Sequence, residues 1–128
     1  MDRQSNKKKE LQQKINTGNE SVRRSPFSVT SQDAVLSAID EFDLIGRDTF
    51  LKKYGYHKAV SYLLVHNGSY YDSKAIIGVA FGYQHRTLPL ANDEFSGGKA
   101  TVEKALTRMG FGIEKTKSTA LNFLLSRP

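Results

Sequence analysis

The sequence predicts an α+β domain, in which a small antiparallel sheet (a hairpin plus a C-terminal strand) packs against about four helices. The predicted order is α-α-β-β-α-α-β. Two observations carry this prediction: apolar residues recur with helical spacing in several segments, and two β-prone runs meet at Asn67-Gly68. Asn-Gly between such runs is typical of a two-residue hairpin, because both residues tolerate positive φ angles.

Two helices are expected before the hairpin. Residues 28–33 offer several capping side chains, and the apolar positions that follow, 34, 35, 38, 39 and 42, form one helical stripe. Gly46 interrupts this stripe. A second helix of about two turns resumes at Phe50 and ends before Gly55.

The hairpin is expected to lead directly into a third helix. Its strands are residues 61–66 and 69–71, and the periodicity changes from strand to helix at Asp72-Ser73. Either of these two side chains suits the helix N-cap. The helical stripe then continues to about Gly82.

The last third of the domain is predicted to contain a loop, a helix and a strand. Residues 84–96 have few periodic positions and form a candidate binding loop. A helix is expected from Lys99 to Met109, ended by Gly110. Residues 111–115 alternate as a final strand does.

The 128 residues have room for one domain with a modest core. Residues 1–30 lack hydrophobic periodicity and are expected to be a disordered basic tail, with the folded domain at 31–116. Residues 117–128 are expected to be a loose C-terminal segment or a short docking helix. The tail holds seven Lys/Arg and three acidic residues, net +4, whereas residues 31–128 hold twelve and ten, net +2. Much of the basic character therefore lies in the tail, where a polyanion-binding role and a solubilising role are both open.

Several classes of protein are disfavoured by composition. The chain has no cysteine and no apolar run near the roughly 18 residues of a membrane span, so we expect a cytoplasmic protein without membrane contact. Its histidines, His57, His66 and His85, do not have the spacing of metal ligands. No catalytic constellation is recognisable. We therefore expect no enzymatic activity, metal or cofactor.

Several blocks of the sequence together carry a family resemblance. They are Gly46-Arg47-Asp48-x-Phe50-Leu51, Tyr71-Asp72-Ser73-Lys74-Ala75 and Phe95-Ser96-Gly97-Gly98, within a pattern that covers roughly residues 33–115. This pattern resembles the N-terminal head domain of ScoMcrA-like modification-dependent (type IV) HNH restriction endonucleases. The resemblance implies a module that accompanies DNA recognition and restriction. The chain shows no HNH constellation and so no evident cutting machinery, and a nuclease is a candidate partner.

The first candidate DNA-binding site lies where the hairpin meets the third helix. Lys74 and Ser73 stand at a helix N-terminus, which favours phosphate, and Tyr70 and Tyr71 offer rings for stacking. Neighbouring strand residues face opposite ways, so the two tyrosines cannot both be core. The alternative is that alternate tyrosines pack against the helices, Asp72 caps the helix and Lys74 is a solvated surface residue.

The second candidate site is the diglycine entry to the fourth helix. Ser96, Gly97, Gly98 and Lys99 suit either an anion cradle or a plain helix cap. Further candidates for contacts to phosphate or base edges are His66, His85 and Arg86. The guanidinium of Arg86 can donate two hydrogen bonds to a phosphate or to a guanine. All of these groups are expected to share one exposed surface.

The resulting prediction is a DNA-binding accessory module of a restriction or phage-defence system, with DNA, modified or not, as partner. The alternative is a protein-interaction or dimerisation domain that docks a nuclease partner, with the tyrosines as its interface.

Overall fold

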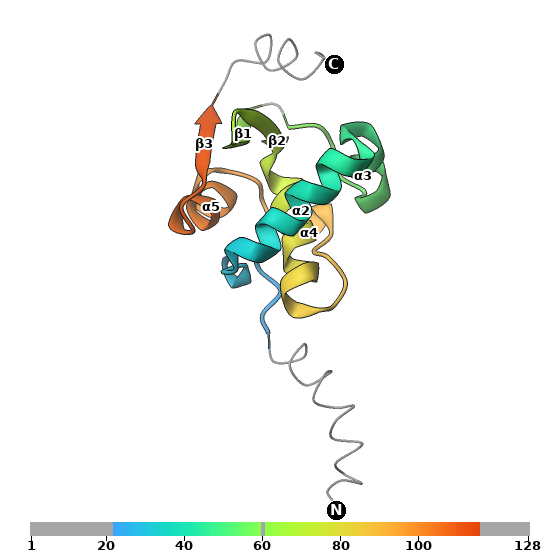
Figure 1. The fold of residues 1–128 in the computed structure, drawn as a ribbon. Coiled ribbons are helices and arrows are strands. Elements are labelled where there is room, and N and C mark those ends of the chain that lie inside the picture. Colours follow the sequence, from blue (N-terminus) through green and yellow to red (C-terminus); the bar gives the residue numbers. More distant parts are fainter. Residues whose placement is uncertain (1–21, 60, 116–128) are drawn as a thin grey trace, which may run out of the picture.

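A computed structural model describes residues 22–59 and 61–115 of the chain. Four helices and one three-stranded sheet make up most of this part, which confirms the predicted α+β class and element order. Figure 1 shows α2 (Gln32–Ile45) crossing α4 (Ser73–His85), with the strands gathered at one end of that pair. Residues 1–21 and 116–128 are outside the described part. The predictions of a disordered tail and of a loose C-terminal segment or docking helix concern these residues.

The sheet has the strand order β2-β1-β3 and is antiparallel throughout. Strand β1 (Tyr62–His66) pairs with β2 (Ser69–Asp72) on one side and with β3 (Gly112–Lys115) on the other. Asn67 and Gly68 have φ angles of 49° and 77°, which confirms the predicted two-residue hairpin.

Short polar and glycine signals set the helix ends as predicted in the first half of the domain. The Ser31 hydroxyl accepts a hydrogen bond from the Ala34 backbone N–H and caps α2. Gly46 separates α2 from α3 (Arg47–Tyr54), and Gly55 ends α3 in the left-handed conformation.

Helix α4 continues past Gly82, where it was expected to end, and stops at Arg86, which has a φ of 52°. Gly82 serves close packing instead, because a Cβ there would lie 3.0 Å from the carbonyl oxygen of Thr87 and 3.2 Å from Pro89. The missing side chain lets the chain fold back along the helix directly after it ends.

The helix expected from Lys99 to Met109 begins as one π-helical turn, η3 (Lys99–Glu103), and only then becomes α5 (Lys104–Arg108). The carbonyl of Gly98 accepts from the N–H of Glu103, five residues later, which defines the wide turn. Gly110 follows with a φ of 94°.

Residues 22–30, which the sequence assigns to the basic tail, pack on the domain. A 3₁₀ turn, η1 (Pro26–Ser28), is capped by Ser25, and Val29 is buried. The Arg24 guanidinium donates to the carboxylate of Glu94, the last residue of a further 3₁₀ turn, η2 (Asn92–Glu94). Ordered structure therefore begins before the predicted boundary at residue 31.

The core cluster contains side chains from α2, α3, α4, η3 and α5 and from the inner face of the sheet. The largest fully buried side chains of the described residues are Val35, Phe50, Leu63, Leu64, Ile76, Ile77, Val79, Phe81, Leu90, Val102 and Leu106. None of the helices in the described part of the chain has the length and apolarity that a bilayer crossing requires.

Candidate nucleic-acid interface

A hollow of about 430 Å³ opens where β2 runs into α4. We call it the junction pocket. Its lining comes from the segment after α3, the start of β1, the end of β2, the start of α4, η2 and the loop before η3. The lining residues are His57, Lys58, Ala59, Ser61, Tyr62, Asp72, Ser73, Lys74, Asn92 and Gly97. Three of the predicted candidates, Ser73, Lys74 and Gly97, thus meet in one place.

The inner end of the junction pocket is built around the carboxylate of Asp72, which is 2% exposed. Arg47 donates two hydrogen bonds to it, at 2.8 and 2.7 Å, and the backbone N–H of Ala59 donates a third, at 2.8 Å. The expectation that Asp72 or Ser73 caps α4 is wrong, since no side chain caps this helix. Asp72 instead joins the start of α3, the segment before β1 and the start of α4.

Ser73 does not present its hydroxyl to solvent. The side chain is buried and donates a hydrogen bond to the carbonyl of Tyr62 at 3.1 Å. Its predicted role as a DNA contact is therefore corrected to a structural one, because the hydroxyl proton already joins β1 to α4.

Lys74 is half-buried and held in place. Its ammonium donates to the backbone carbonyl of Asn92 at 2.6 Å and to the side-chain oxygen of Asn92 at 3.1 Å. The same ammonium lies 5.1 Å from the centre of the Phe95 ring. Burial lowers the pKa of Lys74, and the nearby charge of Asp93 opposes that shift. Two of the three N–H groups of the ammonium are thus engaged, which leaves one for a phosphate.

Gly97 allows Lys74 to take this position. A Cβ at residue 97 would lie 2.9 Å from Cδ of Lys74 and 3.2 Å from its Cγ. A glycine is therefore required at the first position of the Gly97-Gly98 pair, because any side chain there would collide with the methylene groups of Lys74.

Lys58 is the exposed cation at the junction pocket. Its side chain is 64% exposed and lies 3.6 Å from the carboxylate of Asp48, which is 85% exposed. A pair this open is weak and exchanges readily with another anion. On the same side, the ammonium of Lys115 lies 5.8 Å from the ring centre of Tyr62, which also lines the pocket.

The two predicted stacking tyrosines separate. Tyr71 is buried, packs edge-on against Phe42 and donates its hydroxyl to Asp43 at 2.9 Å. Its candidate role as an exposed stacking ring is therefore wrong. Tyr70 lies on the other face of β2, half-buried opposite Val65.

His85 and Arg86 stand at the far end of α4 from Lys74. A helix of 13 residues is about 20 Å long, so these two residues and the junction pocket lie at separate places. The His85 ring packs against Phe81, and its Nε2 donates to the carbonyl of Ser28 at 2.8 Å. The expectation that all candidates share one surface is therefore wrong.

The remaining candidates are spread along the sheet and the π-helical turn. His66 packs its half-buried ring against Phe111. The Ser96 and Gly98 carbonyls accept from the Thr101 hydroxyl, and Gly98 also accepts from the Thr101 backbone N–H. Lys99 lines a separate groove, which is formed by Lys99, Ala100, Glu103, Lys104 and Thr107.

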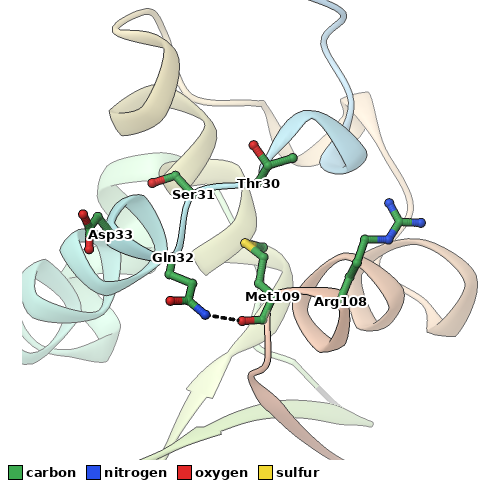
Figure 2. Close-up of a pocket in the computed structure, with 6 residues that line it drawn as sticks. All are labelled: Thr30, Ser31, Gln32, Asp33, Arg108 and Met109. Atoms are coloured by element: carbon green, nitrogen blue, oxygen red, sulfur yellow. Dashed lines mark hydrogen bonds between the residues drawn. The ribbon is translucent and has the colours of Figure 1, made fainter.

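A second hollow, of about 480 Å³, lies beside the N-terminus of α2 and contains none of the predicted residues. Figure 2 shows it between Ser31 and Met109, spanned by the hydrogen bond from the Gln32 side chain to the Met109 carbonyl. Asp33 and Arg108 lie at its opposite ends, so the hollow has a negative side chain at one end and a positive side chain at the other. The Arg108 guanidinium also lies 5.4 Å from the Phe27 ring centre.

The sequence pattern did not indicate four of the residues that build the junction pocket: Arg47, His57, Lys58 and Tyr62. Three of them belong to the aperiodic stretch before β1 or to its first position, so their direction could not be inferred from spacing. The arginine in Gly46-Arg47-Asp48 does offer a signal, because an arginine at a helix start is a candidate partner for the carboxylate of Asp72. Among the described residues, no cluster of histidines and acids has the make-up of a metal site.

Comparison with known proteins identifies a family and a similar solved structure. The family described as "ScoMcrA-like, N-terminal head domain" matches residues 27–115. The structure described as that of the type IV phosphorothioation-dependent restriction endonuclease ScoMcrA is 36% identical, with a TM-score of 0.50. The match covers 68% of this chain and 13% of that chain. No curated protein matches the sequence.

Proposed function

The chain belongs to the family of ScoMcrA-like N-terminal head domains, and we propose that it is a DNA-binding accessory module of a restriction and phage-defence system. In this proposal it works in the cytoplasm, with a nuclease as a candidate partner. The observation that carries it is the junction pocket, which Lys58, Lys74 and Tyr62 line from separate segments.

The contact is made with the phosphate backbone. Lys58 exchanges its exposed partner Asp48 for a phosphate oxygen, and Lys74 supplies the N–H that Asn92 leaves unused. Asp48 and Asp93 reduce the positive potential nearby, so binding is modest and falls steeply with salt. DNA approaches this side and not the outer face of α2, where Asp40 and Asp43 would repel it.

The test is the salt dependence of binding of a labelled 20-base-pair duplex to the full chain, followed by fluorescence anisotropy. A control variant replaces Lys7, Lys8, Lys9 and Lys14 with glutamine, which removes tail charge and leaves the described domain intact. We expect this control to keep a log–log salt slope of at least about 2, one unit per engaged domain lysine. A slope near zero in the control would assign all binding to the tail and reject the proposal.

A second arm uses the same duplex with a phosphorothioate linkage. The solved relative is described as phosphorothioation-dependent, but contacts by lysine charge alone do not distinguish the two linkages. We expect equal affinity for both duplexes. A strong preference for the modified duplex would show a recognition site in place of simple backbone binding.

The alternative, a protein-interaction domain, is favoured by a different observation. Leu44 and Leu88 are 83% and 76% exposed, and apolar side chains of this kind pack in the buried centre of protein–protein interfaces. The buried Tyr71 cannot serve as the interface that the sequence suggested. Sedimentation of the purified chain tests this alternative: a dimer that Leu44→Ser or Leu88→Ser dissociates would support it, and a monomer without duplex binding would leave only a heterologous nuclease as partner.

A further inference from the structure

We infer that the junction pocket receives the base of one unpaired nucleotide, while the phosphate of that nucleotide stays at the lysines. This inference rests on the proposed DNA-binding function. It adds the class of ligand, a nucleotide whose base is free of pairing, and it assigns the pocket side chain that contacts the base, Tyr62.

The size and walls of the pocket fit a flat aromatic group. Its volume of about 430 Å³ is within the range of cavities that hold small organic ligands. Its lining includes one aromatic residue, Tyr62, together with Ala59 and Lys74. In the inferred complex the base stacks on the Tyr62 ring, since aromatic rings are the surfaces on which nucleic-acid bases stack without sequence preference.

The charges of the pocket orient such a ligand. Asp72 lies at the inner end, where its carboxylate is 2% exposed, whereas Lys58 is 64% exposed. Arg47 balances the charge of Asp72 at the inner end, so a phosphate meets no free cation there, whereas Lys58 attracts it at the opening. A neutral base needs no such counter-charge inside the pocket. The geometry thus favours the base inside and the phosphate at Lys58.

A paired base cannot enter, because its ring is stacked within the duplex. Insertion requires a nucleotide that is unpaired or extruded, at a cost that is smallest where pairing is already absent. The pocket therefore distinguishes distorted or single-stranded DNA from intact duplex, a property that backbone contacts alone do not provide.

The experiment compares three labelled duplexes with the full chain: one with a single bulged deoxyadenosine, one with an abasic bulge at the same place, and one fully paired. The abasic bulge keeps the backbone distortion and removes only the base. We expect the adenosine bulge to bind about tenfold more tightly than the abasic bulge, which corresponds to one stacked base. Equal affinity for the two bulges would overturn the inference.

Two variants locate the effect. Tyr62→Ala should bring the two bulges to within about twofold of each other, whereas Tyr62→Phe keeps the ring and the tenfold ratio. Ala59→Leu fills the pocket from another segment and should also remove the ratio, so the test does not depend on whether Tyr62→Ala folds well. A ratio that survives Ala59→Leu and Tyr62→Ala would also overturn the inference.

A last arm separates DNA from a free nucleotide as the source of the base. We expect dAMP to compete with the adenosine bulge only in large excess, because it lacks the neighbouring phosphates. If dAMP binds as tightly as the bulged duplex, the pocket is a mononucleotide site and the inference is wrong. Loss of binding to all three duplexes would instead reject the DNA-binding function itself.

Discussion

The guanidinium of Arg47 holds the carboxylate of Asp72 through two hydrogen bonds of 2.8 and 2.7 Å. The arginine begins α3 and the aspartate ends β2, so this pair connects two elements that are 25 residues apart. Both side chains are largely removed from solvent, at 16% and 2% exposure. The junction pocket therefore depends on a charge pair that neither element can form alone.

Arg47→Met is expected to lower the free energy of unfolding by about 3 kcal/mol. The reason is that the buried carboxylate of Asp72 loses its opposite charge and keeps only the Ala59 N–H. Urea unfolding measures the change. Asp48→Asn is the matched control: it breaks an exposed pair of 3.6 Å and should cost less than about 0.5 kcal/mol. Similar losses of unfolding free energy in both variants would show that the buried pair stabilises the domain no more than the exposed pair does.

Gly78→Ala is expected to destabilise the domain by about 3 kcal/mol, because the new methyl group overlaps a buried contact. A Cβ at residue 78 would lie 1.9 Å from the Tyr56 hydroxyl, which donates to the Leu90 carbonyl at 2.5 Å. Gly98→Ala is the control, since no atom lies within 4 Å of its added Cβ and its φ is −94°. Thermal unfolding should separate the two variants clearly, and an unchanged melting temperature in Gly78→Ala would contradict this packing.

Acid should weaken the contact between Arg24 and Glu94. Hydrogen bonds from Arg24 and from the backbone N–H of Ala91 lower the pKa of Glu94 to about 2. A lowered folded-state pKa stabilises the protein above the unfolded value, near 4.3, and that contribution disappears as the pH falls towards 2. The side chain is 32% exposed, so the contribution is less than about 1 kcal/mol. Glu94→Gln should therefore be less stable than the parent at pH 6 but equal to it near pH 2; the same difference at both pH values would argue against this assignment.

The two lysines of the junction pocket are expected to differ when replaced. Lys74→Ala should lower stability by about 1–2 kcal/mol as well as weaken duplex binding, because it loses both Asn92 contacts and the Phe95 ring. Lys58→Ala should change stability by less than about 0.5 kcal/mol and reduce the log–log salt slope by about 1. Calorimetry and anisotropy together test this. Equal stability of both variants would show that Lys74 does not hold the Asn92 loop.

Removing the partner of Lys58 should have the opposite effect on binding. Asp48→Asn eliminates a negative charge 3.6 Å from the lysine, so the duplex should bind a few-fold more tightly at low salt. The increase should vanish at high salt, where exposed charges are screened. Weaker binding by Asp48→Asn, measured by anisotropy, would place the DNA on another face.

Local signals made the fold predictable. The Asn67-Gly68 turn, the Ser31 cap and the Gly46 and Gly55 helix ends are properties of a few neighbouring residues, and the structure has each of them. The extension of α4 to His85 is not indicated by the sequence, because a glycine such as Gly82 commonly ends a helix. Its actual use is close packing against residues 87–89, which depends on tertiary structure.

The candidate site was predicted only in part, for a similar reason. Alternation along β2 required Tyr70 and Tyr71 to face opposite sides, but which of them is buried depends on the position of Asp43 on α2. The pairing of Arg47 with Asp72 also spans distant segments. Lys58 and Tyr62 could not be assigned a direction, because the stretch before β1 has no period.

The most direct test of the DNA-binding proposal is an amide chemical-shift map of the full chain during titration with a short paired duplex. The proposal predicts that the largest changes fall on residues 57–62, 72–74 and 92–97 and that they fade as salt is raised. Changes confined to residues 1–21, or centred on Asp40 and Asp43 of α2, would contradict it.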